Sequence, residues 1–354
     1  MDGGMPVWFM DAFRFLAGAE MSAPHGCCRR CRIQARDMAC VIEAFRPYPF
    51  AEAAFIHARG RGSSYGHERL EGIVQINLCL QGRLGWQLAD GTCRYLGAGD
   101  VSAHRMDASP PLGVSLPWEE VRDLMVLVDL AKFEAAMPQA LQEIGFSMEA
   151  LLEHSAGGGL SILPLAMAGF PFSAPPEGWG AEHRLAWVRL KVQEFLLTLH
   201  AGATASPAPA SAGYPQEKAV RIQAVHDYLT RHLAEHATVR DLSRRFFMNA
   251  DDLKKGFKLV YGMPIGKYMQ AFRMKRAAEL LSGTAMQVQD VAASVGYGHP
   301  GKFAQAFRDR MHVSPSGWRK AGERPPEAPS RTPEAEELPG GSSCIGKAGP
   351  ETTL

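Results

Sequence analysis

Residues 288–308 read VQDVAASVGYGHPGKFAQAFR, and apolar side chains recur at helical spacing on both sides of a glycine-rich break. Val291 faces inward in the segment before the break, and Phe303 and Phe307 form one stripe after it. Gly296 suits the position just past a helix end, where the backbone takes a positive φ. This stretch therefore predicts two short helices joined by a tight turn, which is a helix-turn-helix unit.

The same arrangement occurs once more, upstream. The hydroxyl of Thr238 is placed to cap a short helix, and the break at residues 247–249 precedes a third helix with Leu253 and Phe257 inward. Between the two units the pattern predicts one continuous helix over residues 265–281. A helix of that length spans about 25 Å. The second helix of each unit, here called its reading helix, would lie near one end of it, so the two reading helices could meet successive major grooves, about 34 Å apart.

Charge is distributed unevenly along the chain. Its 354 residues carry a formal net charge of +1, yet residues 217–320 hold 18 Lys and Arg against 9 Asp and Glu. The rest of the chain holds 20 against 28. A basic block confined to the helical segment indicates an anionic partner, and nucleic acid is the commonest one.

Five motif pieces in this block resemble the DNA-binding domain of the AraC/XylS transcription regulators. They are residues 238–242 (TVRDL), 273–281 (RMKRAAELL), 290–297 (DVAASVGY), 306–308 (AFR) and 315–319 (PSGWR). The resemblance covers residues 218–320 and implies seven helices, of which the third and sixth enter major grooves of double-stranded DNA. It also implies RNA polymerase as a partner and activation of transcription. The sequence of residues 252–262 (DLKKGFKLVYG) resembles that of the iron-siderophore-responsive branch of the family.

Outward positions of the two reading helices follow from this resemblance. Lysine can bond guanine and glutamine can pair with adenine, whereas Lys258, Arg308 and Arg310 are better placed to hold phosphates. Two departures from the family pattern are His299-Pro300-Gly301, in place of polar residues, and His312, in place of glycine. The predicted DNA-binding residues are Asp251, Lys254, Lys255, Lys258, Pro300, Gly301, Ala304, Gln305, Arg308 and Arg310.

The N-terminal half has strand periodicity. Residues 74–80 alternate apolar side chains with Gln75, Asn77 and Cys79, and Asp90-Gly91 and Gly99-Asp100 mark turns. Short strands at this spacing suggest an antiparallel barrel or sandwich. The resemblance to the AraC/XylS family implies that this part is a cupin-like antiparallel β-barrel, the sensor and dimerisation domain of an α+β chain. The apolar stripe of a helix over residues 181–200 either packs on this barrel or forms a seam between two subunits.

Composition divides the chain into five parts. We expect a poorly ordered leader at 1–45, the sensor domain at 46–200, a Pro- and Ala-rich linker at 201–216, the DNA-binding domain at 217–320 and a disordered tail at 321–354. The N-terminus lacks the order of a secretory signal and no apolar run would span a bilayer, so we expect a cytoplasmic protein without a membrane.

No catalytic, metal or cofactor set is evident. His67 and His104 are isolated, and Cys79 has no nearby base, so we expect no enzyme activity. The N-terminal cysteines are expected to be reduced thiols in a loose leader, with a zinc site as the less favoured reading. They are Cys27, Cys28, Cys31 and Cys40.

The function that these features favour is regulation of transcription by a homodimer that senses a small-molecule effector, such as a ferric siderophore. One alternative is a cupin-type small-molecule enzyme or binding protein with an accessory DNA-binding module. Another is an effector-binding protein whose helical block serves dimerisation.

Overall fold

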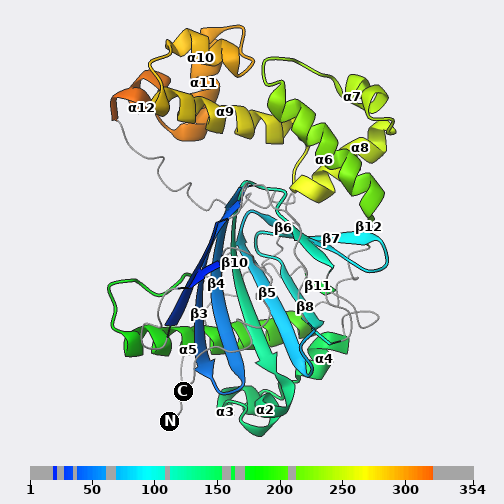
Figure 1. Cartoon of the computed structure of the whole chain (residues 1–354), viewed down its shortest axis with the longest axis vertical. Helices are drawn as coiled ribbons and strands as arrows, with labels where there is room; N and C mark the ends of the chain where they lie inside the picture. The colour runs from blue at the N-terminus through cyan, green and yellow to red at the C-terminus, as the bar shows by residue number, and fades with distance from the viewer. Residues whose placement is uncertain are drawn as a thin grey trace, which may run out of the picture.

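The computed structural model describes residues 19–21, 28–34, 38–60, 69–107, 112–153, 161–163, 172–205 and 213–321. Figure 1 shows an N-terminal part, built from two sheets and four helices up to residue 205, beneath a helical module that begins at residue 216. The fold is therefore mixed, with antiparallel sheets and helices in the N-terminal part and helices alone from residue 216 on, as expected for an α+β protein. Some positions considered in the sequence analysis lie outside the described residues, namely Cys27, His67, 206–212 and 322–354.

One large sheet forms most of the N-terminal part. Its eight strands are antiparallel wherever they pair. In spatial order they are β1 (Ala19–Met21), β2 (Cys28–Gln34), β3 (Met38–Tyr48), β4 (Ala51–Gly60), β10 (Glu120–Asp129), β5 (Ile73–Gln81), β8 (Val101–Arg105) and β11 (Ser161–Leu163). The expectation of a poorly ordered leader up to residue 45 is wrong for residues 28–34 and 38–45, because β2 and β3 pair along most of their length and bury Ile33 and Cys40.

A smaller sheet crosses one end of the large one. Its strands, in spatial order, are β12 (Tyr214–Pro215), β7 (Thr92–Gly97), β6 (Arg83–Gln87) and β9 (Gly113–Ser115). The turn at Gly91 has a φ of +75°, which glycine adopts without strain, and it returns the chain from β6 to β7. The predicted closed barrel is not confirmed, because the described strands form two separate sheets.

Helices cover the opposite face of the large sheet. Three are short, α2 (Leu130–Ala135), α3 (Gln139–Glu143) and α4 (Met148–Glu153), and the fourth is the long helix α5 (Ala181–Ala205). Val188, Val192, Phe195 and Leu199 of α5 are fully buried in the core that this helix forms with the sheet. The apolar stripe of α5 therefore packs on the sheet of its own chain, which resolves the two readings left open by the sequence.

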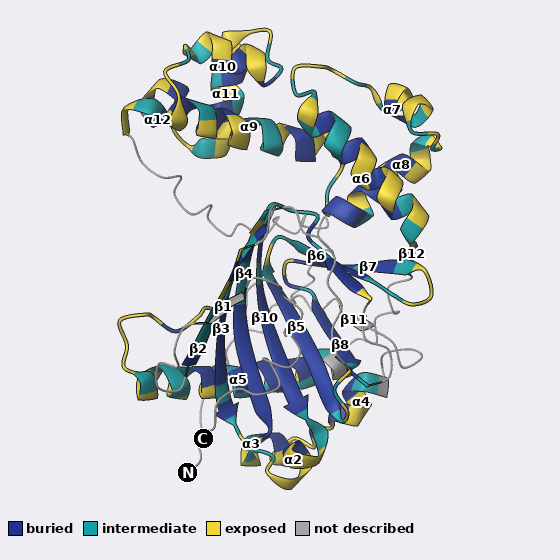
Figure 2. Cartoon of the chain, in the orientation of Figure 1, coloured by how far each residue is buried: buried dark blue, intermediate teal, exposed yellow. Residues whose placement is uncertain are grey.

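The N-terminal part has two cores, one on each face of the large sheet. Phe45 and Val126 point toward α5, whereas Leu127 points toward Trp86 and Leu96 of the smaller sheet. Figure 2 shows that the central strands are buried along nearly their whole length. Buried on both faces, β5 and β10 have no solvent-exposed side, so any polar residue in their middle lies in protein.

Seven helices form the helical module, as the sequence predicts. They are α6 (Gln216–Arg231), α7 (Val239–Arg245), α8 (Ala250–Tyr261), α9 (Ile265–Gly283), α10 (Val288–Ser294), α11 (Pro300–Met311) and α12 (Pro315–Ala321). The helical spacing of residues 218–234 predicts that Val220 faces inward, and this prediction is wrong, because Val220 of α6 is 59% exposed. Among the described residues, no helix combines the length and apolar character needed to cross a bilayer.

The cysteines of β2 and β3 lie within the sheet. Cys31 and Cys40 are free thiols, and burial raises the pKa of Cys40 to about 12. A thiol that stays protonated is a poor metal ligand. No group of three or more potential metal ligands occurs in the described part of the chain.

Candidate nucleic-acid interface

The first helix-turn-helix unit starts at a capping box, in which two reciprocal hydrogen bonds close the N-terminus of α7. Thr238 Oγ1 accepts a hydrogen bond from the Asp241 backbone N–H at 3.2 Å, and Asp241 Oδ2 accepts one from the Thr238 backbone N–H at 3.0 Å. After α7, Phe247 turns the chain with a φ of +52°. Asn249 then caps α8 by accepting from the Asp251 backbone N–H at 2.8 Å. The predicted turn at residues 247–249 is thereby confirmed.

The helix α8 presents its cations outward. Leu253 and Phe257 are fully buried and fix the orientation of the helix against α6 and α7. Its predicted DNA-binding residues are all exposed: Asp251, Lys254, Lys255 and Lys258. Lys254 lies 3.4 Å from Asp251 across one turn, a weak surface pair that a phosphate or a base could replace.

The second unit repeats this arrangement with different end residues. Gly296 has a φ of +87°, and a Cβ there would lie 2.4 Å from the carbonyl oxygen of Leu233, so only glycine fits. Pro300 occupies the first turn of α11, where its missing N–H is harmless, and His299 makes no side-chain cap. His312 ends α11 in the left-handed conformation, with a φ of +60°. The departure from glycine at 312 therefore keeps the turn geometry.

The predicted DNA-binding residues of α11 are exposed, with one exception. The structure places Pro300, Gly301, Gln305, Arg308 and Arg310 on the exposed surface and leaves Ala304 half-buried. Pro300 and Gly301 offer no side-chain hydrogen bond, so these two positions can contribute only backbone contacts.

Two features of α11 were not foreseen from the sequence. Lys302 is exposed and lies one turn before Gln305, a spacing of three that puts both on one helix face. The amide of Gln305 donates to Asp309 Oδ1 at 2.6 Å. A base would therefore have to compete with Asp309 for the Gln305 amide.

The connecting helix α9 belongs to both units at once. Tyr268 and Met269, near its start, pack in the core of α6, α7 and α8. Met274 and Leu281, near its end, pack in the core of α10, α11 and α12, together with Trp318. With 19 residues, α9 is about 28 Å long. Because side chains of α9 pack in both cores, this helix fixes the distance between the two units.

Side chains of the N-terminal part hold the last turn of α8. Arg83 Nη2 donates to the backbone carbonyl of Leu259 at 2.6 Å, and Trp118 Nε1 donates to that of Tyr261 at 3.1 Å. The indole of Trp118 also packs edge-on against Tyr268, with ring centroids 6.0 Å apart. Carbonyls at a helix C-terminus lack intrahelical partners, and a cation there is favoured by the helix dipole. Burial lowers the pKa of Arg83.

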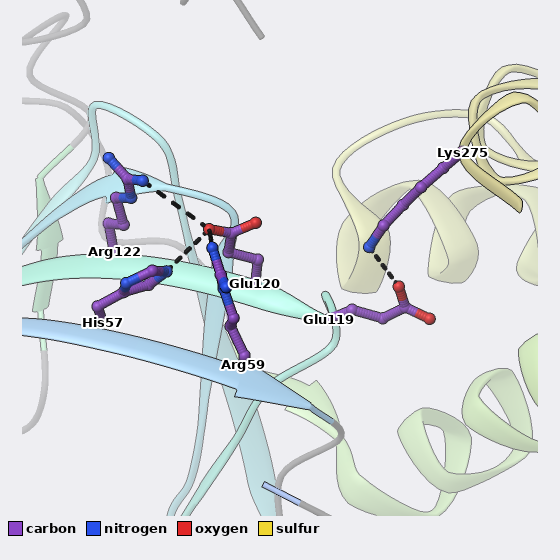
Figure 3. A network of polar contacts seen from close by, with 6 residues as sticks. All are labelled: His57, Arg59, Glu119, Glu120, Arg122 and Lys275. Atoms are coloured by element: carbon purple, nitrogen blue, oxygen red, sulfur yellow. Dashed lines mark hydrogen bonds and ion pairs between the residues drawn. The ribbon is translucent and has the colours of Figure 1, made fainter. Parts of the chain in front are cut away.

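An ion pair extends the contact to α9. Lys275 Nζ lies 2.5 Å from Glu119 Oε2, at the start of β10 (Figure 3). The next residue, Glu120, accepts a hydrogen bond from His57 Nε2 at 2.8 Å and lies 3.4 Å from Arg59. Partial burial alone would raise the pKa of Glu120, but the His57 hydrogen bond and the Arg59 charge hold that pKa below its ordinary value. These contacts surround Glu120, the first residue of β10, directly after Glu119.

The chain enters the helical module through β12, which pairs with β7. Tyr214 lies opposite Cys93 in this pairing, and a Cβ on Gly256 of α8 would fall 2.1 Å from the Tyr214 hydroxyl oxygen. Glycine at 256 thus allows the tyrosine to approach the helix. The smaller sheet, Arg83 and Trp118 together contact the first unit through α6, α8 and α9.

Known proteins match the helical module. Residues 242–321 match the family model described as a helix-turn-helix domain. This part of the chain is a helix-turn-helix domain. The lactose operon transcription activator of Staphylococcus xylosus is 30% identical over 98 residues, which are 28% of this chain and 35% of that protein. The transcriptional activator AarP of Providencia stuartii is 27% identical over 92 residues, 26% of this chain and 68% of that protein.

The similarity to the first of these relatives covers about a third of its length. Both of these relatives are transcription activators by name. Among solved structures, fatty-acid-bound ToxT of Vibrio cholerae covers 81% of this chain and 96% of its own, at 12% identity and a TM-score of 0.30.

Proposed function

We propose that this protein is a sequence-specific DNA-binding transcription regulator of the AraC/XylS type. In this proposal α8 and α11 enter adjacent major grooves of one duplex. Lys254, Lys255 and Gln305 read base edges, and Lys258 and Arg308 hold phosphates. The other contacts assigned from the sequence are Asp251, Pro300, Gly301, Ala304 and Arg310.

The observation that carries the proposal is that α9 is built into the cores of both units. A helix about 28 Å long, fixed at both ends, holds α8 and α11 at a set distance. Each of these helices buries one face and exposes basic residues on the other. Single-chain recognition of two successive grooves requires this combination.

The N-terminal part is proposed to sense a small-molecule effector. From the resemblance to the siderophore-responsive branch, a ferric siderophore is one effector class to test. A homodimer, an interaction with RNA polymerase and a cytoplasmic location belong to the same proposal. Effector binding would shift the equilibrium between arrangements of the N-terminal part that hold α8 differently.

Binding to DNA tests the proposal directly. The full chain is used to select duplexes from a randomised library, and affinity for the selected duplex is measured across salt concentrations. We expect two conserved blocks about one helical turn apart, and log affinity that falls steeply with log salt, because several phosphates are neutralised. Lys254→Ala combined with Lys255→Ala should erase one block and leave the other.

The matched control removes two exposed cations from the N-terminal part, Arg59→Ala with Lys132→Ala. This control should select the same two blocks with the same salt slope. A slope near zero, or selection unchanged by the α8 double variant, would refute the proposal and favour a helical block that serves dimerisation.

A further inference from the structure

Four polar residues lie together between the two sheets. Gln75, Asn77, Ser102 and Asp123 are each at most 2% exposed. They share the face of the large sheet that packs against Trp86 and its neighbours, since the apolar residues alternating with them point toward α5. We call these four residues the polar row.

The strand register brings the polar row together. Asn77 of β5 lies opposite Ser102 of β8 and is two residues from Gln75 along its own strand. Asp123 of β10 lies opposite Cys79, at a bulge in the pairing of β10 with β5. Three neighbouring strands therefore contribute to one patch on the inner face, within a few residues of one another.

Hydrogen bonds link three members of the polar row in one direction. Gln75 Nε2 donates to Asn77 Oδ1 at 2.7 Å, and Asn77 Nδ2 donates to Asp123 Oδ2 at 2.6 Å. Three oxygen atoms are left over: Gln75 Oε1, Asp123 Oδ1 and Ser102 Oγ are buried and accept no hydrogen bond from the part of the chain that the structure describes. The polar row thus ends in acceptors that lack donors.

Buried acceptors of this kind are costly. A polar group taken from water without a partner destabilises the fold, and a carboxylate without a cation does so more strongly. Burial raises the pKa of Asp123 well above its ordinary value, with the Asn77 hydrogen bond acting the other way. Cys79, opposite Asp123, directs its thiol to the carbonyls of Gln81 and Gly82 instead. Once Asp123 is ionised, its Oδ1 and Gln75 Oε1 need N–H or O–H donors, and a cationic donor suits the carboxylate best.

We propose that the polar row binds a small organic cation, a primary amine with a second hydrogen-bond donor. The ammonium group would donate to Asp123 Oδ1, and the second donor to Gln75 Oε1 or Ser102 Oγ. An anionic ligand is disfavoured, because it would place negative charge beside Asp123 with Glu52 buried on the same face. The inference rests on the proposed function in that this cation would be the effector.

The strands that carry the polar row also carry the contacts to α8 and α9. β5 runs from Gln75 past Cys79 to the turn that leads into Arg83, and β10 begins beside Trp118 and Glu119 and continues to Asp123. A ligand that pulls β5 and β10 together at Asp123 would therefore move the residues that hold the first reading helix. β5 and β10 thus end within two residues of Arg83, Trp118 and Glu119, which contact α8 and α9.

Calorimetric titration of the full chain tests the ligand class with matched four-carbon probes: putrescine, 4-amino-1-butanol, 1,4-butanediol and 4-aminobutyrate. We expect the first two to bind at least about tenfold more tightly than the diol and the amino acid, because only they pair a cation with a neutral or cationic donor. Repeating the titration in buffers of different ionisation enthalpy should show proton release when the amine binds, since the cation favours the ionised carboxylate. Other titratable groups lie near Asp123 or on the same face, namely Glu52, Cys79, Arg83, Asp100 and His104. The proton release is therefore assigned to Asp123 only if it is lost in Asp123→Asn.

Asp123→Asn keeps the shape and removes the charge, and it should abolish both amine binding and proton release. Asp129→Asn, the same change at an exposed-end position of the same strand, should preserve both. Ser102→Ala is the second variant, since loss of one hydroxyl is compatible with folding, and it should weaken binding by about threefold to tenfold.

Three results would overturn the inference: no binding of either amine, equal binding of the diol, or amine binding unchanged in Asp123→Asn. Binding of a ferric siderophore in place of the amines would overturn the ligand class. DNA selection and its salt slope are measured without any amine. If the chain selects no duplex, the proposed function is wrong. If it selects a duplex but binds neither amine, only the inferred ligand class is wrong.

Discussion

Arg83 donates a hydrogen bond from Nη2 to the backbone carbonyl of Leu259, 2.6 Å away, in the last turn of the helix assigned to read the first groove. The donor belongs to the N-terminal part and the acceptor to the helical module. The lysines on the outer face of α8 stay exposed beside this contact. The contact therefore holds the helix from its end without covering the surface that would meet DNA.

Arg83→Met should loosen the end of α8. The variant keeps the aliphatic stem but leaves a buried carbonyl without its charged donor, a loss of about 1.5–3 kcal/mol. Hydrogen exchange followed by mass spectrometry should show faster exchange in a peptide covering α8 and no change in a peptide covering β4. Arg59→Met, which removes an arginine that is 65% exposed, serves as the control and should leave both peptides unchanged. Equal protection of α8 in Arg83→Met would contradict this account.

His312→Gly should stabilise the protein. At a φ of +60°, histidine carries a strain of about 1–2 kcal/mol, whereas glycine adopts this conformation freely and loses only about 0.5–1 kcal/mol through the unfolded chain. The free energy of unfolding in urea should therefore rise by up to about 1 kcal/mol. His299→Gly is the matched control: its φ of −125° is ordinary for any residue, so the change should destabilise. A lower unfolding free energy for His312→Gly would show that its side chain stabilises α11 in some other way.

Thr238→Ala should destabilise α7 by about 1 kcal/mol, because the first turn loses its side-chain acceptor. Hydrogen bonds from the Thr238 side chain and backbone lower the pKa of Asp241. A carboxyl whose folded pKa is depressed contributes stability above its unfolded pKa and loses it as the pH falls through the folded value. The difference in unfolding free energy between wild type and Thr238→Ala should therefore become smaller at acidic pH. Urea unfolding at neutral and acidic pH checks this, and Thr230→Ala, within α6, should show no such narrowing.

Local patterns were sufficient to predict the helical module. The seven helices, the cap at Thr238 and the glycine turn at 296 all follow from signals within a few residues, namely helical spacing, a hydroxyl before a helix and a glycine after one. The exposure of the predicted α8 residues follows from the same spacing. Lys302 could have been found in this way too, since it shares a face with Gln305.

Long-range relationships were not predictable from these patterns. The alternating pattern in residues 74–80 indicates a strand. It does not distinguish a strand with one solvent-exposed face from a strand that is buried on both faces. Asn77 and Asp123 are 46 residues apart in sequence, and only the pairing of β5 with β10 brings them within 2.6 Å. Likewise nothing near Arg83 or Trp118 indicates that their partners are carbonyls of α8. The short β2 and β3 signals were hidden by mixed composition.

Asp309→Ala should strengthen binding to the selected duplex. Asp309 places a negative charge on the helix that approaches phosphates, and it holds the Gln305 amide at 2.6 Å. Removing an unfavourable exposed charge of about 0.5–1 kcal/mol corresponds to an affinity gain of roughly threefold. Binding is measured by fluorescence anisotropy at fixed salt, with Glu143→Ala on the distant helix α3 as the control that changes net charge equally. If release of the amide contributes, Gln305→Ala in the Asp309→Ala background should reduce the gain and weaken selection at one base pair. A gain that Glu143→Ala reproduces would instead assign the effect to net charge alone.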